Sequence, residues 1–299
     1  MGTNWSLPIH REPAQGCLPA DIRQSRFRTV LLAALNTRFY GPLLESAALG
    51  TQEEIAELGS IEDALARLPS VDPSASQVYS SAFLNRNEAE NRRSDLFWPL
   101  PPAARTAVLM DGFCQRGGVQ VFQRGQRSEI ASYAPEALAG PVSELRALAD
   151  AVEDRGVRIP RLAHSVIAFT ILRQGFLSDE VRELFWRVFK VPVFGQILSP
   201  GGAILAWECE AHEGFHFNRD CAVFQTQSGS GEPELLVTSL VDLRRPVIRL
   251  ATALTGSVEC SACGCGQSGP RLMGLRRRSI SKANPAAAFA ASGAGQESA

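Results

Sequence analysis

Two short stretches of the sequence hold residue types that bind metal ions. Residues 207–217 read WECEAHEGFHF, and residues 260–266 read CSACGCG. A structural zinc ion takes four Cys and His ligands in a closed tetrahedron. A strand end, a turn and a Cys-x-Cys loop would supply such a set. We therefore predict a zinc site formed by Cys209, His216, Cys263 and Cys265.

The sequence leaves alternatives open for this ligand set. Cys260 begins a C-x-x-C motif, the commoner zinc spacing, so it can replace one of the cysteines, and His212 can replace His216. A catalytic zinc would keep an open position and need a general base. Glu208 or Glu213 could be that base, but nothing else in the sequence builds a substrate site around them. We therefore predict a structural role for the zinc.

The composition indicates a globular protein in a reducing compartment. The 299 residues are 45% hydrophobic and 20% charged. The net charge is −1, so no overall field attracts nucleic acid or an anionic membrane surface, and no apolar run is long enough to span a bilayer. Seven cysteines without an export signal favour a metal cluster over disulfides. We expect a cytoplasmic protein.

The pattern of the sequence changes several times along the chain, which predicts five regions. In order, these are a loose leader (1–22), a helical N-terminal segment (23–98), an α/β core (99–200), a β-rich subdomain with the Cys/His cluster (201–274) and a disordered tail (275–299). The tail is rich in small residues, which cannot bury enough surface to become ordered.

The helical segment contains local signals for helix ends. An apolar-rich stretch predicts a helix over 28–49 with a break near Gly41-Pro42. Thr51 and Ser60 each begin a capping-box pattern, which marks a helix start. The two short helices that these patterns predict span 52–58 and 61–68.

After residue 98, strand patterns alternate with helix patterns, which is typical of an α/β layer with a partly parallel sheet. Trp186 and Phe189 are predicted to be core residues of one of these helices. Beyond residue 200, strand patterns follow one another without helices, which indicates antiparallel pairing. The predicted strands before residue 200 are 106–110, 119–122, 166–170 and 191–194, and the predicted helices are 142–154 and 178–189.

From Pro192 on, the motifs follow an order that resembles the phenylacetate–CoA ligase branch of the adenylate-forming (AMP-binding) superfamily. The motifs are FG at 194–195, WEC at 207–209, GFH at 214–216, LLVTSL at 235–240, PVIRLATAL at 246–254, CGCGQ at 263–267, PRL at 270–272 and GLRRR at 274–278. RFYGPLLESAALG and SIEDALARLP, near the N-terminus, are similar to the opening helices of that family.

The resemblance implies an α/β fold in which a partial adenylate-forming large domain carries a C-terminal β-rich, zinc-stapled subdomain. Some members of this branch hold zinc at the positions that match the predicted ligands. Arg249 matches an arginine of the family's nucleotide-binding turn. An active relative would use ATP, Mg²⁺ and CoA.

The sequence departs from the family at the positions that handle ATP. Leu198 stands where the family has the acid that holds Mg²⁺, and Leu254 stands where it has the aspartate that binds the ribose. A leucine can neither ligate a hard cation nor accept a hydrogen bond. No Gly-rich phosphate loop occurs, and Lys282 in the tail is a poor substitute for the catalytic lysine of the family's C-terminal lid.

We therefore predict a degenerate relative of these ligases that does not adenylate by itself and acts as a binding or scaffolding protein, with a full-length ligase as one candidate partner. The alternative is an acyl- or aryl-CoA ligase-type enzyme with a diverged ATP site or a partner chain that completes it. A zinc-dependent nucleic-acid module is a third class. Seven arginines between 244 and 278 favour it, but no base-reading helix or aromatic platform accompanies them.

Overall fold

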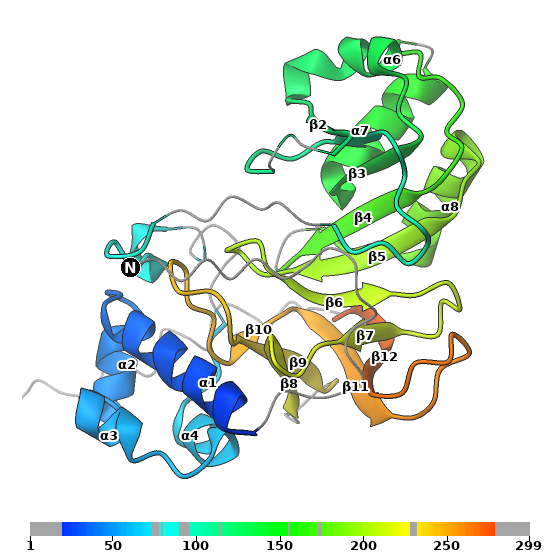
Figure 1. Cartoon of the computed structure of the whole chain (residues 1–299). Helices are drawn as coiled ribbons and strands as arrows, with labels where there is room; N and C mark the ends of the chain where they lie inside the picture. Colours follow the sequence, from blue (N-terminus) through cyan, green and yellow to red (C-terminus); the bar gives the residue numbers. More distant parts are fainter. Residues whose placement is uncertain are drawn as a thin grey trace, which may run out of the picture.

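The structure of the chain, a computed structural model, describes residues 20–278 except 73–77, 79, 90–95, 114, 116, 155, 173–174 and 228–231. The described strands form one sheet of nine strands and one of three. Figure 1 shows a part made of parallel strands and helices lying above a part made of antiparallel strands and the N-terminal helices. The predicted leader up to residue 19 and the tail from residue 279 lie outside the described residues.

The parallel half of the large sheet consists of β1 (Thr106–Val108), β2 (Val119–Val121), β3 (Ala137–Pro141), β4 (Val166–Ile171) and β5 (Val193–Leu198). These strands pair in the spatial order β2-β1-β3-β4-β5. Every residue of β4 and β5 is buried, as expected for a parallel sheet that is covered on both faces. The predicted α/β class is confirmed.

The antiparallel half continues the same sheet. It consists of β6 (Ile204–Glu208), β7 (Phe215–Phe217), β12 (Pro270–Arg277) and β11 (Leu254–Cys260), in that spatial order. Because β5 and β6 pair antiparallel across a short turn, the sheet crosses the boundary that we predicted at residue 200. The small sheet holds β8 (Ala222–Gln227), β9 (Glu234–Ser239) and β10 (Leu250–Ala251).

The helices of the upper part are η2 (Arg124–Glu129), α6 (Ile130–Tyr133), α7 (Val142–Glu153) and α8 (Asp179–Phe189). The side chains of α7 and α8 pack with the parallel strands in one apolar cluster that includes Leu145, Phe185 and Phe189. The α8 helix begins where the sequence predicts, because the Ser178 side chain accepts a hydrogen bond from the amide of Val181. Trp186, predicted to be core, is instead 54% exposed, since its position on α8 faces away from the sheet.

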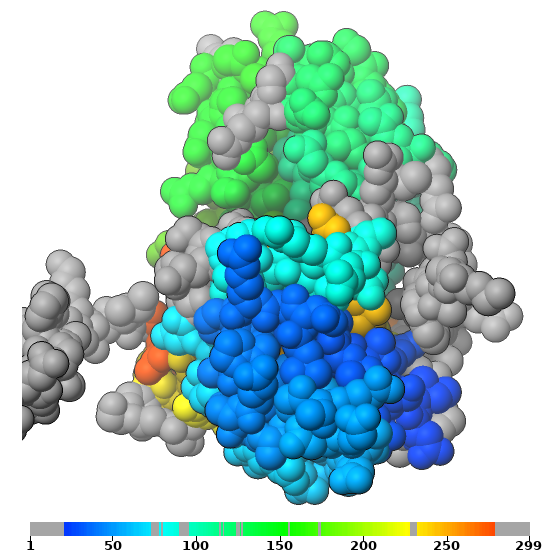
Figure 2. Space-filling view, turned by 90° about the vertical axis from the view of Figure 1, so that its left-hand side faces the viewer, coloured from blue at the N-terminus to red at the C-terminus, as the bar shows by residue number. Residues whose placement is uncertain are grey.

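The N-terminal helices are α1 (Ala20–Leu35), α2 (Tyr40–Ser46), α3 (Gln52–Ala56), α4 (Ile61–Arg67) and the short η1 (Ser81–Phe83). In Figure 2 they cover the lower half of one face of the molecule. Their side chains, among them Phe27 and Leu44, share a core with the antiparallel strands through Phe224 and Leu272. None of the described helices is long and apolar enough to cross a membrane.

The capping patterns in the sequence predicted the helix starts correctly, whereas the predicted break in the first helix was misplaced. Thr51 and Glu54 form the full capping box, and the Ser60 side chain accepts a hydrogen bond from the amide of Asp63. The break predicted near Gly41-Pro42 lies earlier, between α1 and α2. Gly41 and Pro42 stand in the first turn of α2, where a proline costs no hydrogen bond because that turn's amides have no partner within the helix.

Several boundaries and strands differ from the prediction. The α1 helix begins at Ala20, inside the predicted leader, and β12 runs through Arg277, inside the predicted tail. The extended end of β12 pairs with β11, where Leu254 and Thr255 stand opposite Arg277 and Arg276. The strands β3, β11 and β12 were not predicted.

Candidate metal centre

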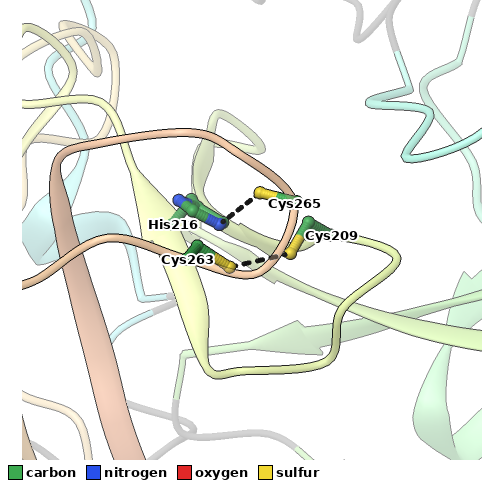
Figure 3. Close-up of side chains that lie close together, drawn as sticks. All are labelled: Cys209, His216, Cys263 and Cys265. Carbon is green, nitrogen blue, oxygen red and sulfur yellow. Dashed lines mark hydrogen bonds between the residues drawn. The ribbon is translucent and has the colours of Figure 1, made fainter.

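Four of the predicted ligands meet where β6, β7 and the loop between β11 and β12 come together. Figure 3 shows the side chains of Cys209, His216, Cys263 and Cys265 pointing toward one another. Their ligand atoms all lie within 4.8 Å of one another. The Sγ atoms of Cys209 and Cys263 are 3.5 Å apart, and Cys265 Sγ lies 3.5 Å from Nε2 of His216. Cys209 follows the last residue of β6, and His216 is the central residue of β7.

These distances fit the edges of a tetrahedral metal site. With metal–sulfur bonds of about 2.3 Å and metal–nitrogen bonds of about 2.0 Å, tetrahedral neighbours lie about 3.8 Å apart for two sulfurs and about 3.5 Å apart for sulfur and nitrogen. A disulfide would need sulfur atoms about 2.05 Å apart, whereas Cys209 and Cys263 are at 3.5 Å. The four side chains could therefore hold a zinc-sized ion with small adjustments.

Burial shifts the pKa values of Cys209 and His216 toward their uncharged forms. Burial raises the pKa of the Cys209 thiol to about 12, although the amide of Ala211 at the sulfur acts in the opposite direction. Burial, and then the charge of Arg271, lower the pKa of His216, which keeps its imidazole neutral. A neutral imidazole is the form that binds metal ions, and a divalent cation is what would convert such buried thiols into thiolates.

The loop that carries two of the cysteines is closed by its own backbone. The amide of Gly266 donates to the carbonyl of Cys263 at 2.9 Å, and the amide of Cys263 donates to the carbonyl of Gln267 at 3.2 Å. Gly266 has a φ of 83°, a conformation that a residue with a side chain rarely adopts. This tight turn directs Cys263 and Cys265 toward the same point.

Arg271 of β12 connects the two metal-binding stretches. Its side chain is 4% exposed, and one guanidinium nitrogen donates to the carbonyl of Glu213 at 2.7 Å. The other donates to the Ser261 hydroxyl at 2.8 Å and to the Ala262 carbonyl at 3.0 Å. The Glu213 carboxylate in turn accepts from the amide of Gly264 at 2.8 Å. Local sequence patterns do not predict this contact, because Arg271 and Glu213 lie far apart along the chain.

Neither alternative ligand belongs to the cluster. His212 lies in the turn between β6 and β7, where its ring stacks on Phe194 with centroids 4.9 Å apart. Cys260 is exposed at the end of β11, and its sulfur accepts a hydrogen bond from Arg219 at 3.3 Å.

The two glutamates considered as general bases are engaged in structural contacts. Glu208 pairs with Arg182 at 2.7 Å and accepts a hydrogen bond from the amide of Gly195. The Glu213 carboxylate accepts hydrogen bonds from the amide of Gly264 and from the guanidinium of Arg271. Because four protein ligands fill a tetrahedron, the cluster also leaves no open position for a substrate. An ion held by all four side chains would therefore have a structural role.

Gly195 of β5 packs so closely against Phe215 and Glu208 that a side chain at this position does not fit. A Cβ atom at this position would be 2.8 Å from Cζ of Phe215 and 3.1 Å from a Glu208 carboxylate oxygen. We expect Gly195→Ala to lower the free energy of unfolding by about 2 kcal/mol in urea denaturation, because Phe215 cannot move without disturbing β7. Gly59→Ala is the matched control, since its nearest neighbour would be at 3.9 Å. Equal stability of the two variants would contradict this expectation.

The residues that the resemblance matches to nucleotide positions, Leu198, Leu254 and Arg249, are not part of the metal cluster. Leu198, at the carboxyl end of β5, is buried in an apolar cluster with Phe169. Leu254 begins β11 and is buried as well. The guanidinium of Arg249 donates to the side-chain oxygen of Gln225 at 3.1 Å. A cavity of about 20 Å³ lies beside Leu254.

Six of the seven arginines near the C-terminus contact other protein groups, including Arg249, which donates to Gln225. Arg271 is buried, while Arg276 and Arg278 pair with Glu232 and Glu234. Arg244 and Arg245 donate to backbone carbonyls, among them that of Glu88. These cations are therefore not a free basic face.

Comparison with known proteins identifies the fold. No protein-family model matches the sequence, and no curated protein does. Structures of 2-hydroxyisobutyryl-CoA ligase do match. An open conformation in complex with 2-HIB-AMP and CoA gives a TM-score of 0.64 at 16% identity, over 93% of this chain and 75% of the ligase chain. The chain has the fold of an adenylate-forming acyl-CoA ligase.

A second structure of the same ligase, in the postadenylation state with 2-HIB-AMP, agrees. It gives a TM-score of 0.63 at 16% identity, over 93% of this chain and 73% of the ligase. The match extends over nearly the whole chain, so it includes the N-terminal helices and the middle region that the motifs did not cover. The ligase fold that the motif order predicted is thereby confirmed, and the similarity is one of fold.

Proposed function

We propose that this chain is a cytoplasmic binding or scaffolding protein that keeps the ligase fold and a structural zinc site but does not adenylate an acid by itself. It would be a degenerate relative of the phenylacetate–CoA ligase branch. The observation that carries this proposal is the small cavity beside Leu254, because an adenylating enzyme must bind a nucleotide at the ribose position of the family.

The volume of that cavity is the first argument. The residues around it include Thr252, Ala253 and Leu254 together with Gly175 and Phe176, and it encloses about 20 Å³. A single water molecule needs about 10–15 Å³ of such volume, whereas ligand pockets have about 300–1,000 Å³. An adenosine group is many times larger than this cavity.

The chemistry of the neighbouring positions is the second argument. Mg²⁺ requires oxygen ligands, and the position of the family's magnesium-binding acid is occupied by Leu198 within an apolar cluster. The matching arginine, Arg249, is turned to Gln225. The zinc ion would be held by Cys209, His216, Cys263 and Cys265 and would hold β6, β7 and the β11–β12 loop together.

Acid-dependent ATP–pyrophosphate exchange tests this proposal. With phenylacetate and short hydroxy acids as substrates, we expect exchange no higher than that of heat-killed protein, and no shift of the unfolding temperature with millimolar ATP and Mg²⁺. Saturable exchange that Arg249→Ala abolishes would overturn the proposal and favour the ligase alternative. A change in the exchange rate of a full-length ligase when this chain is added, relative to the ligase alone, would identify that ligase as a partner.

A further inference from the structure

An open cavity lies at the end of the parallel sheet opposite the nucleotide positions. It has a volume of about 580 Å³ and lies between α8 and the turn that joins β6 to β7. Asp179, Arg182 and Trp186 of α8 line one side, and Glu208 and His212 face them. Val193, at the amino end of β5, is also part of the wall. Ligands of open α/β sheets bind beyond the carboxyl ends of the strands, so this cavity is separate from the site of the parent fold.

One wall of the cavity is a single face of α8. Asp179, Arg182 and Trp186 are spaced by three and four residues, so they lie along one side of the helix. The Trp186 indole is 54% exposed, although large aromatic groups are usually buried. The ring of Pro192 adds apolar surface near it. The wall thus has an apolar aromatic end and a carboxylate end.

The floor of the cavity is a buried ion pair whose charges cancel. Glu208, whose side chain is 6% exposed, lies 2.7 Å from the Arg182 guanidinium, and Arg182 also donates to the carbonyl of Val193. Asp179 has no ion pair among the described residues and therefore leaves the charged side chains of the lining with one net negative charge. A cation would balance that charge.

We propose that this cavity binds an organic cation, an ammonium or guanidinium group on an apolar stem. The exposed face of Trp186 attracts such a group through a cation–π contact, and the Asp179 carboxylate pairs with it. Pro192 and Val193 cover the stem. An arginine or lysine side chain of a partner protein has this chemistry, and so does a free amine. The assignment to a partner rests on the proposed scaffolding function.

The zinc-loaded full chain is the right material for the test. His212 of the cavity wall lies on the segment between Cys209 and His216, which are two of the proposed zinc ligands. Bound zinc would fix both ends of that segment. The probes are N-acetyl-arginine amide and the peptide acetyl-Ala-Leu-Arg-Leu-Ala-amide, each paired with its citrulline counterpart. Citrulline has nearly the shape of arginine without its charge. Binding is measured by isothermal titration calorimetry, and the shift of the Trp186 indole NMR signal, assigned with Trp186→Phe, shows in the wild type that the probe binds at this cavity.

We expect both arginine probes to shift the Trp186 signal saturably and neither citrulline probe to do so. Trp186→Ala and Asp179→Asn should each weaken binding by about fivefold or more. Glu180→Gln, a change at the neighbouring exposed carboxylate outside the cavity lining, should leave binding unchanged. Tighter binding of the peptide than of the amide assigns the site to a protein partner, and equal binding assigns it to a free cation.

Absence of binding by the arginine probes, equal binding of citrulline, or full affinity in Trp186→Ala would overturn the proposal. None of these results depends on ATP. A failure here is therefore distinguishable from a failure of the proposed lack of adenylation, which pyrophosphate exchange measures.

Discussion

Protein purified without a metal-binding tag contains one zinc ion per chain, and Cys209→Ser contains none. This is the result we expect from elemental analysis. Replacing Cys209, which is 2% exposed, removes one of four ligands and leaves a buried hydroxyl facing Cys263. Zinc binding supplies about 10–16 kcal/mol in zinc-finger peptides. We expect only part of this energy to appear in the free energy of unfolding of this chain. The apolar clusters on both sides of the sheet do not involve the metal, so they still stabilise the fold when it is lost.

For the same variant we expect the free energy of unfolding to fall by about 4 kcal/mol, corresponding to a midpoint about 6 °C lower. A strong chelator should have the same effect on the wild type and none on Cys209→Ser. Cys260→Ser is the matched control, since Cys260 is exposed and outside the cluster. Zinc retained in Cys209→Ser, or lost in Cys260→Ser, would disprove the ligand set.

The second large effect is expected at Glu208. Replacing Glu208 with alanine leaves the Arg182 guanidinium without its carboxylate and the amide of Gly195 without its acceptor. Breaking a buried pair by removing one partner costs about 3–5 kcal/mol when both groups are fully buried. Arg182 is 28% exposed and can recover some hydration. We therefore expect a loss of about 3 kcal/mol in urea denaturation of the zinc-loaded protein.

Two matched variants separate the possible causes of this loss. Glu208→Gln keeps an acceptor and the side-chain volume but loses the charge, so its stability should lie between that of the wild type and Glu208→Ala. Glu210→Ala changes an exposed carboxylate two residues away and should cost less than about 0.5 kcal/mol. Equal stabilities of Glu208→Ala and Glu210→Ala would mean that the ion pair contributes nothing to the fold.

Features that depend on neighbouring residues were predictable from the sequence. The side chains of Thr51 and Ser178 cap the helices that follow them, because a cap needs only a few adjacent residues. The helices α7 and α8 were found from their periodicity. The strand β4 was found from a short run of apolar and β-branched residues, and the run predicted at 191–194 overlaps the start of β5. Three cysteines and one histidine in two short stretches were enough to suggest a zinc site.

Features that depend on distant residues were decided by the tertiary structure. The strand β3, with the sequence ALAGP, has low strand propensity and forms because β1 and β4 pair with it on both sides. Pairing with β11 likewise extends β12 to Arg277, inside the predicted tail. Trp186 became part of a cavity wall because the orientation of α8 on the sheet, which the sequence does not encode locally, turned it outward.

The choice between the two histidines illustrates the difference. His212 and His216 are both within reach of Cys209 along the chain, and the sequence left the two open. Pairing of β7 with β6 and β12 turns His216 toward Cys265, while the left-handed turn at His212 stacks its ring on Phe194. The sequence by itself determined which residue types were available for a metal. Only the register of the sheet decided which of them meet, because side chains on a strand alternate between its two faces.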